Sequence, residues 1–207
     1  TDKTKLLILN SPSNPTGAVY TEAEFTAIMD WAIARGLFVL SDEIYDQLVF
    51  APAKMTSAIG WFAKYPEQVA VLNGLSKSYA MTGWRLGYAA GPAPVIKQMT
   101  KIHQFSIMCA PTTSQYAAVE ALRNGDADIE EMRGQYDMRR RLLVDGLNRM
   151  GLDCFSPEGA FYVFPSIRST GLSSSEFCMR LLEAERVAVV PGDAFGESGE
   201  GFVRISY

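Results

Sequence analysis

The sequence predicts an α/β fold, in which part of a mostly parallel sheet with flanking helices is followed by a small α+β unit. Short apolar runs alternate with segments of helical periodicity, which is typical of strands joined by helices. The chain has 207 residues, more than one domain of ordinary size. The pattern changes near residue 128, so we expect one unit over residues 1–128 and a smaller one over residues 129–207.

The first unit opens with a strand at Leu6–Leu9, which ends at a loop (residues 10–17) with two prolines and a glycine. Thr21 and Glu24 have the spacing of a helix capping box. The helix that follows has an apolar stripe at Phe25, Ile28, Met29 and Ala32 and ends at Gly36. Further strands are expected at Leu37–Leu40, Val69–Leu72 and Arg85–Ala90, the last of them running back, with a short helix near Trp61.

Helices dominate the next part of the chain. Apolar stripes predict one helix over Val95–Ile102, a second over Tyr116–Leu122 and a long one over Ile129–Met150. In the second unit we expect strands at Phe161–Phe164, at Val187–Val190 and from Phe202 onward, and a helix capped by Ser173 and Glu176. His103 is expected to cap or pack at a helix end, and Arg139–Arg141 to form a solvated face.

Composition excludes several classes of protein. Hydrophobic residues make up 48% of the chain and charged residues 20%, which excludes a disordered chain. A net charge of −4 argues against a nucleic-acid partner, and the lack of a long apolar run argues against a membrane partner. The N-terminus does not resemble a signal peptide. Cys109, Cys154 and Cys178 are widely spaced, so we expect buried thiols in the cytoplasm and no metal site.

Polar residues follow three successive predicted strands. Asn14 follows the first strand, Asp42 and Tyr45 follow the second, and Lys77 follows the third. In an open parallel sheet these positions border the ligand crevice. Ser76 precedes Lys77 where a phosphate-binding P-loop requires glycine, so a nucleotide-phosphate loop is excluded. Lys77 by itself is either a surface charge or an amine that forms a Schiff base with a carbonyl.

The segment Leu75–Tyr88 resembles the lysine segment of class I/II aminotransferases, the fold-type I enzymes that use pyridoxal 5′-phosphate (PLP). Three other segments also resemble family blocks and come in the family's order: Asn14–Gly17, Asp42–Tyr45 and Phe202–Ile205. The resemblance implies a PLP-transferase-like fold. It implies that residues 1–128 are the C-terminal part of the large PLP-binding domain, and that residues 129–207 are the small domain, truncated at its end.

The resemblance also assigns cofactor-binding roles. Lys77 would form a Schiff base with PLP and move the proton at the substrate α-carbon. Asp42 would pair with the pyridinium nitrogen and keep the ring an electron sink. Tyr45 and Asn14 would donate hydrogen bonds to the 3′ oxygen of the cofactor, which lowers the pKa of the Schiff base.

Three further assignments follow from the same resemblance. Arg85 would bind the cofactor phosphate through its guanidinium fork, and Ser76 would add a hydroxyl. Many relatives place a serine three residues before the lysine, where this chain has Gly74. Arg204 would bind the substrate α-carboxylate, and the Asn14–Pro15 peptide would be cis. The Phe161–Tyr162 segment would either line the substrate side or pack in the core.

The implied activity is transfer of an amino group between an L-amino acid, of aspartate or aromatic type, and a 2-oxo acid. Two alternatives remain: a PLP-dependent β-lyase, and a truncated domain without activity. The resemblance implies a homodimer in the full-length form and relatives roughly twice as long as this chain. Part of the apolar content should therefore lie on surfaces meant for other segments, and we expect exposed apolar patches.

Overall fold

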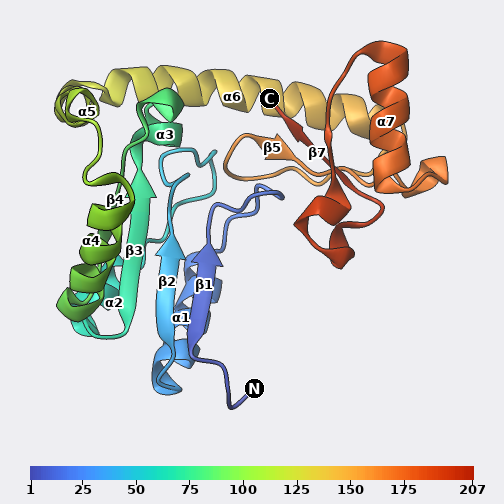
Figure 1. The fold of residues 1–207 in the computed structure, drawn as a ribbon. Coiled ribbons are helices and arrows are strands. Elements are labelled where there is room, and N and C mark those ends of the chain that lie inside the picture. The colour runs from blue at the N-terminus through green and yellow to red at the C-terminus, as the bar shows by residue number, and fades with distance from the viewer. The chain divides into compact units, whose positions relative to one another are not determined.

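The computed structural model describes residues 1–207 and divides them into two compact units (Figure 1). The first unit comprises Thr1–Pro12 and Val19–Met132, and the second comprises Ser13–Ala18 and Arg133–Tyr207. The division lies within helix α6 (Asp126–Arg149), close to the predicted break at residue 128. The loop at residues 13–18 belongs to the second unit, which sequence patterns gave no reason to expect. No helix is both long and apolar enough to span a membrane.

The first unit is built on a four-stranded sheet in the order β1-β2-β3-β4. Its strands are β1 (Leu6–Asn10), β2 (Phe38–Asp42), β3 (Val69–Gly74) and β4 (Gly87–Ala90). The first three are parallel, and β4 runs antiparallel to β3. The register pairs Asn10 with Asp42 and Asp42 with Leu72, so the carboxyl ends of the parallel strands share one edge. The predicted mostly parallel sheet with flanking helices is confirmed.

Helix α1 (Glu22–Ala34) covers one face of this sheet. The Thr21–Glu24 capping box is present in both directions, as predicted. Phe25, Met29 and Ala32 are buried and pack with strand residues such as Leu9 and Val39. Trp61 of α2 (Ile59–Lys64) meets the Phe25 ring edge-on, with the ring centroids 5.7 Å apart. This core follows from an apolar stripe on α1 that faces alternate strand residues.

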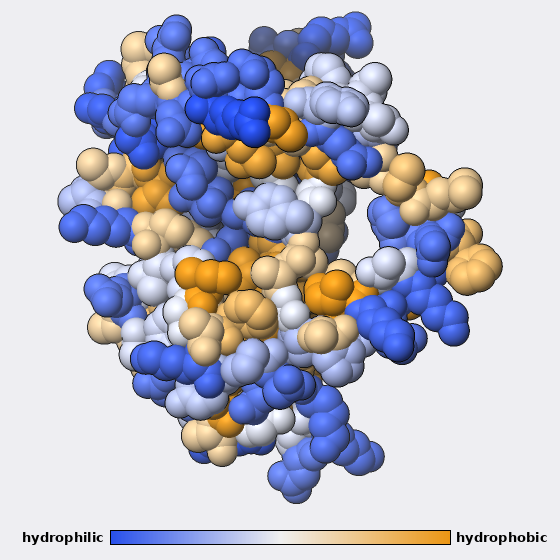
Figure 2. Space-filling model, turned by 90° about the vertical axis from the view of Figure 1, so that its left-hand side faces the viewer, coloured by the Kyte–Doolittle hydropathy of each residue, from blue (hydrophilic) through white to orange (hydrophobic).

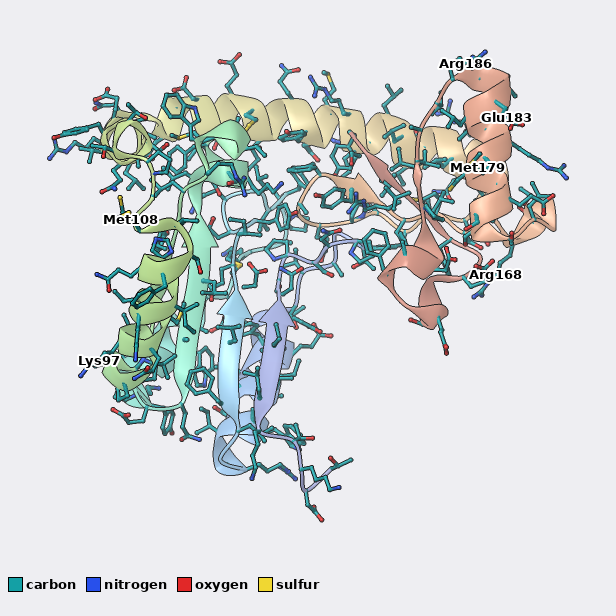
Figure 3. The ribbon with its side chains drawn as sticks, in the orientation of Figure 1. Lys97, Met108, Arg168, Met179, Glu183 and Arg186 are labelled. Carbon is teal, nitrogen blue, oxygen red and sulfur yellow. The ribbon has the colours of Figure 1, made fainter.

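The helices α4 (Ala93–Ile107) and α5 (Thr112–Asn124) are less covered than their sequence suggests. Helix α5 buries Ser114 and Ala118, while its predicted stripe at Tyr116, Val119 and Leu122 is exposed. Helix α4 likewise exposes Met99 and Ile102. Figure 2, which views the α4 side, shows apolar side chains among polar ones on the surface. Figure 3 labels Lys97 and Met108 toward opposite ends of α4. The expected exposed apolar surface is therefore present on this unit.

The second unit contains a small antiparallel sheet in the order β5-β7-β6. Its strands are β5 (Tyr162–Val163), β7 (Val203–Ser206) and β6 (Val190–Pro191). The predicted strand at Val187–Val190 is wrong in extent, because only Val190 and Pro191 pair with β7. Helix α7 (Ser174–Glu185) begins at the predicted Ser173 cap, and Met179, Glu183 and Arg186 lie along it (Figure 3).

Short helical turns complete the two units. In the first unit they are α3 (Leu75–Ser78) and the 3₁₀ turn η1 (Thr82–Trp84). In the second they are η2 (Arg168–Thr170), η3 (Gly192–Phe195) and η4 (Glu197–Gly199). The core of the second unit forms two clusters, one around Leu147, Cys154 and Val163 and one around Ile167, Cys178 and Val203.

Three predictions about single residues are wrong. Cys109 is exposed just after the C-cap of α4, whereas Cys154 and Cys178 are buried as expected. His103 lies within α4 on its exposed surface, not at a helix end. Arg140 is buried, because acceptors from Asp137, Ser156 and Pro157 surround its guanidinium.

Candidate functional site

Asp42 and Tyr45 lie in a turn that continues directly from β2. Asp42 is the last residue of the strand and is half-buried; its Oδ1 accepts from the Ile44 amide at 3.2 Å. The Asn10 side chain, at the end of β1, donates to the Asp42 carbonyl at 3.2 Å. The Glu43 amide donates to the Leu72 carbonyl at 2.9 Å, which extends the ladder with β3 past Asp42. The strand register therefore places the carboxylate at the carboxyl edge of the sheet, and Tyr45 is buried behind it.

The buried carboxylate of Glu43 links this turn to residues 57–58 by hydrogen bonds, a role that the sequence analysis did not predict. Its side chain is only 3% exposed and accepts three hydrogen bonds. The donors are the Ser41 hydroxyl at 2.9 Å, the Ser57 hydroxyl at 2.7 Å and the Ala58 amide at 2.8 Å. A buried carboxylate is tolerated only when it is satisfied in this way. The residues 57–58 are distant in sequence, so no local pattern reveals the contact.

Lys77 lies on the short turn α3, which follows β3 without a break. Leu75 and Ser78 of this turn are buried, and Lys77 itself is half-buried. The Ser78 hydroxyl donates to Asp46 Oδ1 at 3.0 Å, which ties the Lys77 turn to the turn that carries Asp42 and Tyr45. The ladder and this hydrogen bond place an amine, a carboxylate and a phenol on two neighbouring strand ends.

Gly74 joins β3 to this turn at a place with little room for a side chain. A Cβ atom there would lie 3.1 Å from both the Gly87 Cα and the Leu86 carbonyl. A serine at this position would therefore need these neighbours to move by a few tenths of an ångström. Ser76, which carries the other candidate hydroxyl, lies on α3. Its backbone carbonyl accepts from the Thr82 hydroxyl at 3.0 Å.

Arg85 follows the η1 turn in a left-handed backbone conformation, with φ +54°. Its side chain is exposed, and Nη1 donates to the Thr82 carbonyl at 2.8 Å. A guanidinium has five N–H donors, and this bond uses one of them. The side chain is therefore held against its own loop while keeping donors that suit an anion such as a phosphate.

Arg204 and Asn14 form a pair in the second unit. Arg204 lies on β7, and its Nη1 donates to Asn14 Oδ1 at 2.8 Å across 190 positions of sequence. Because Oδ1 accepts this bond, the donors of the Asn14 amide are the two N–H groups of Nδ2. The Asn14–Pro15 peptide is cis, as predicted.

Two aromatic rings enclose the Arg204 guanidinium. Its Cζ lies 4.5 Å from the Tyr162 ring centroid and 4.9 Å from that of Phe195. Its Nε is buried and has no hydrogen-bond partner. An unsatisfied buried donor on a cation is costly, and a guanidinium suits a carboxylate as its partner. The sequence left the role of Phe161–Tyr162 open; Tyr162 is buried against Arg204, and Phe161 stacks on Tyr136 with centroids 5.3 Å apart.

The predicted site residues therefore form one group in each unit. Asp42, Tyr45, Ser76, Lys77 and Arg85 belong to the first unit, and Asn14 and Arg204 belong to the second. An apolar groove of about 820 Å³ lies elsewhere on the first unit, along β4 and α4 beside His103. It contains none of the predicted site residues, so its size alone does not make it the reactive site. No group of three metal-ligating side chains is present.

Known proteins resemble this chain over its whole length. Residues 1–207 match the family "Aminotransferase class I and II". A putative aminotransferase, YugH, of Bacillus subtilis is 50% identical over 207 residues, which is 100% of this chain and 53% of that protein. The aspartate aminotransferase of Pyrococcus abyssi is 47% identical over 100% of this chain and 54% of its own length.

Solved structures give the same result. An aromatic aminotransferase from Pyrococcus horikoshii superposes with a TM-score of 0.95 at 48% identity, covering 100% of this chain and 56% of that one. A double mutant of the Thermus thermophilus aspartate aminotransferase gives a TM-score of 0.91 at 40% identity, covering 100% and 53%. The chain thus spans about half the length of the curated relatives that it matches.

Proposed function

Because this chain belongs to the class I and II aminotransferase family, we propose that it carries cofactor-binding and substrate-binding residues of a PLP-dependent aminotransferase. The proposed reaction transfers an amino group between an L-amino acid of aspartate or aromatic type and a 2-oxo acid. The relatives described above are named as aminotransferases, which favours transamination over the β-lyase alternative.

One observation carries the proposal: the sheet register places Asp42 and the Lys77 turn at neighbouring carboxyl ends, linked by the Ser78–Asp46 hydrogen bond. A lysine amine and a carboxylate on neighbouring strand ends, with a buried phenol in the same turn as the carboxylate, are the donor and acceptor set that a pyridine aldehyde requires. This arrangement argues against the alternative that Lys77 is only a solvated surface charge.

The residues present fit the groups of PLP one by one. The Lys77 amine suits the aldehyde, which it would hold through a Schiff base, and the Asp42 carboxylate suits a protonated ring nitrogen. The Tyr45 hydroxyl and the Asn14 amide suit the 3′ oxygen. The Arg85 guanidinium and the Ser76 hydroxyl suit the phosphate. When bound, PLP supplies an electron sink for the bond broken at the substrate α-carbon.

The protein's own residues would then do the following. Asp42 holds the proton on the ring nitrogen, because a nearby carboxylate favours the cationic form. Lys77 Nζ moves the proton at the substrate α-carbon as a general base and acid. Arg204 binds the α-carboxylate, and the buried Nε without a partner supports this role, since a carboxylate would satisfy it. Asn14 orients the Arg204 guanidinium through its Oδ1.

Three further assignments belong to the same proposal. We propose that residues 1–128 belong to a large PLP-binding domain and residues 129–207 to a small domain. We propose a homodimer for the full-length form, supported by the exposed apolar side chains of α4 and α5. The proposed compartment is the cytoplasm, which fits two cysteines buried singly in the core.

The test is made on the native polypeptide, meaning the protein at the length its own gene produces. PLP is added, and binding is followed by its visible absorbance. Borohydride treatment and peptide mapping then identify the labelled lysine. We expect the label on Lys77, and Lys77→Ala should lower transamination by at least about 10²–10⁴-fold. The control is Lys97→Ala, which removes an exposed lysine from α4 and should change neither binding nor rate.

Product analysis separates the alternatives. A new amino acid with a 2-oxo acid indicates transamination, whereas ammonia with pyruvate indicates a β-lyase. Label on another lysine, or a Lys77→Ala protein with full activity, would contradict the proposal. The intact mass of the native polypeptide decides the third alternative: a protein of only 22.8 kDa without turnover would be an inactive domain.

A further inference from the structure

The run Arg139-Arg140-Arg141 on α6 contains one arginine that differs from its neighbours. Arg140 is only 9% exposed, whereas Arg139 and Arg141 are exposed. Its Nε and Nη2 donate to Asp137 Oδ1 at 2.9 and 2.5 Å. Its Nη1 donates to the Ser156 hydroxyl at 2.7 Å and to the Pro157 carbonyl at 2.9 Å. A buried guanidinium needs this many partners, and its planar fork fixes their relative positions.

The loop at residues 156–159, which Arg140 holds, is in contact with the loop at residues 13–18. The amides of Glu158 and Gly159 donate to the Gly17 carbonyl at 3.0 and 2.9 Å. Gly17 has φ +72°, and a Cβ atom there would lie 2.5 Å from the Pro157 Cβ and 2.8 Å from the Gly159 carbonyl. The two backbones are therefore in direct contact, and a displacement of Pro157 is transmitted to Gly17.

Both segments lead to Arg204. The loop at residues 13–18 is closed by the Gly17 amide, which donates to the Ser13 carbonyl at 2.8 Å, and it carries Asn14. Asn14 accepts from Arg204 Nη1 at 2.8 Å. On the other side, the chain that leaves Pro157 reaches Tyr162, whose ring lies against the Arg204 guanidinium. Arg140 thus supports the hydrogen-bond partner and one of the stacking partners of Arg204.

We propose that Arg140 is a positioning residue for Arg204. By fixing Ser156 and Pro157 it sets the places of Asn14 and Tyr162, and through them the orientation in which Arg204 meets a substrate carboxylate. Arg140 touches neither substrate nor cofactor. This inference rests on the proposed function, in which Arg204 binds the α-carboxylate, and it goes beyond that function by assigning a second arginine to carboxylate specificity.

The test compares Arg140→Lys with Arg141→Gln in the native polypeptide with PLP bound. A lysine keeps the charge but cannot reach the Ser156 and Pro157 oxygens together with Asp137. Arg141 also pairs with Asp137 but is exposed, so its removal is a matched control on the same helix. We expect Arg140→Lys to raise KM for the amino donor about tenfold, the effect of losing one charge-assisted hydrogen bond, and to lower kcat less than threefold. Arg141→Gln should stay within about twofold for both.

Two substrate probes isolate the carboxylate. The α-methyl analogue of the donor has no α-hydrogen, so it reports binding alone, and its Kd should rise in parallel with KM. The α-carboxamide of the donor has no α-carboxylate to orient, so Arg140→Lys should leave its KM within about twofold. Ser156→Ala, which removes one acceptor, should give a smaller change of the same kind, and Ser156→Thr should restore the wild-type value. Unchanged KM in Arg140→Lys and Ser156→Ala would overturn the proposal, as would equal losses for acid and amide.

The outcomes also separate this inference from the proposed function. A wild-type protein that binds no PLP would contradict both. A protein that binds PLP on Lys77 but shows no preference for the acid over the amide would contradict the role of Arg204 and, with it, that of Arg140. A wild-type preference for the acid that stays unchanged in Arg140→Lys and Ser156→Ala would contradict the role of Arg140 alone. If Arg140→Lys does not fold, the Ser156 pair decides the question, because the Ser156 side chain lies in an exposed position.

Discussion

In the first unit, Asp42 is the last residue of β2 and Lys77 follows the end of the neighbouring parallel strand β3, and the backbone ladders determine where they lie. In the second unit, Arg204 lies on β7, where its backbone pairs with Val190 of β6, and side chains hold its guanidinium. Its neighbours are Asn14, Tyr162 and Phe195, which come from three separate segments. Strand pairing sets the backbone in both units, but the Arg204 guanidinium also depends on side chains from three other segments, so the two groups should respond differently to mutation.

The difference concerns how far a local change spreads. A strand end is supported by several ladder hydrogen bonds at once, so the loss of one side chain leaves the register intact. The orientation of the Arg204 guanidinium, by contrast, depends on every loop that carries one of its enclosing rings or the Asn14 amide. We therefore expect loop variants in the second unit to alter carboxylate binding, and variants in the first unit to alter stability more than geometry.

The largest effect is expected from Gly17→Ala. The substitution places a side chain at φ +72° and only 2.5 Å from the Pro157 Cβ, so it combines backbone strain with steric overlap. We expect a loss of about 3 kcal/mol or more in unfolding free energy, from strain and overpacking together, and weakened carboxylate binding. Urea denaturation and the KM for the amino donor measure the two effects.

Gly171→Ala is the matched control for this variant. Gly171 is in the same unit and has the same φ of +72°, and a Cβ atom added there would have no heavy atom within 4 Å. It should cost only the strain of the left-handed conformation, about 1 kcal/mol. Equal losses in the two variants would mean that the contact between Gly17 and Pro157 is not important, and would weaken the contrast between the units.

In the first unit the largest loss should come from Glu43→Ala. It leaves the Ser41, Ser57 and Ala58 donors without their acceptor, which should cost about 3 kcal/mol. Glu43→Gln keeps one acceptor oxygen, and the Ser57 hydroxyl can turn to accept, so we expect a loss of about 1 kcal/mol. If the ladder alone positions Asp42, the PLP affinity of Glu43→Gln should stay near wild type. A large loss of PLP affinity would show that side chains also position this turn.

The same contrast explains what could be predicted from the sequence. The positions of Asp42, Tyr45 and Lys77 at the sheet edge could be predicted, because strand ends are visible as apolar runs followed by polar residues, and the parallel topology brings these ends together. Their roles in a site stay a prediction. Arg140 was assigned to a solvated face because three consecutive arginines on a helix are usually exposed. Its burial depends on Ser156 and Pro157, which fold back on α6 only in three dimensions. Glu43 was missed for the same reason, since its partners at residues 57–58 are reached through a long loop.

Alkaline pH should weaken the second unit through Cys154. Burial raises the pKa of its thiol from 9.0 to about 11, against a smaller lowering by the backbone hydrogen bond with Phe164. The folded protein keeps a proton that the unfolded chain loses, so this stabilisation is complete below pH 9 and disappears as the pH rises toward 11. The loss is on the order of 2 kcal/mol. Denaturation midpoints of wild type and Cys154→Ala measured from pH 7 to 11 test this. If the midpoints of the two proteins fall in parallel as the pH rises, deprotonation of Cys154 is not the cause of the lost stability.

The smallest effects concern one helix cap in each unit. Thr21→Ala and Ser173→Ala each remove a side chain that accepts from a backbone amide, and each should cost about 1 kcal/mol. The two caps differ in their acidic partner. The Glu24 carboxylate accepts from the Thr21 amide at 2.9 Å, whereas the Glu176 carboxylate pairs with Arg180 at 2.5 Å.

This difference predicts a difference in pH dependence. Hydrogen bonds from the Thr21 hydroxyl and amide lower the pKa of Glu24, so its contribution is present at neutral pH and is lost as the pH falls through the folded pKa. The gap between wild type and Thr21→Ala should therefore narrow below about pH 4, near the ordinary pKa of glutamate. The gap for Ser173→Ala should stay constant, because the Ser173 hydroxyl bonds to the Glu176 amide and not to its carboxylate. Equal pH responses in the two variants would show that the reciprocal bond of the capping box adds no stability to α1.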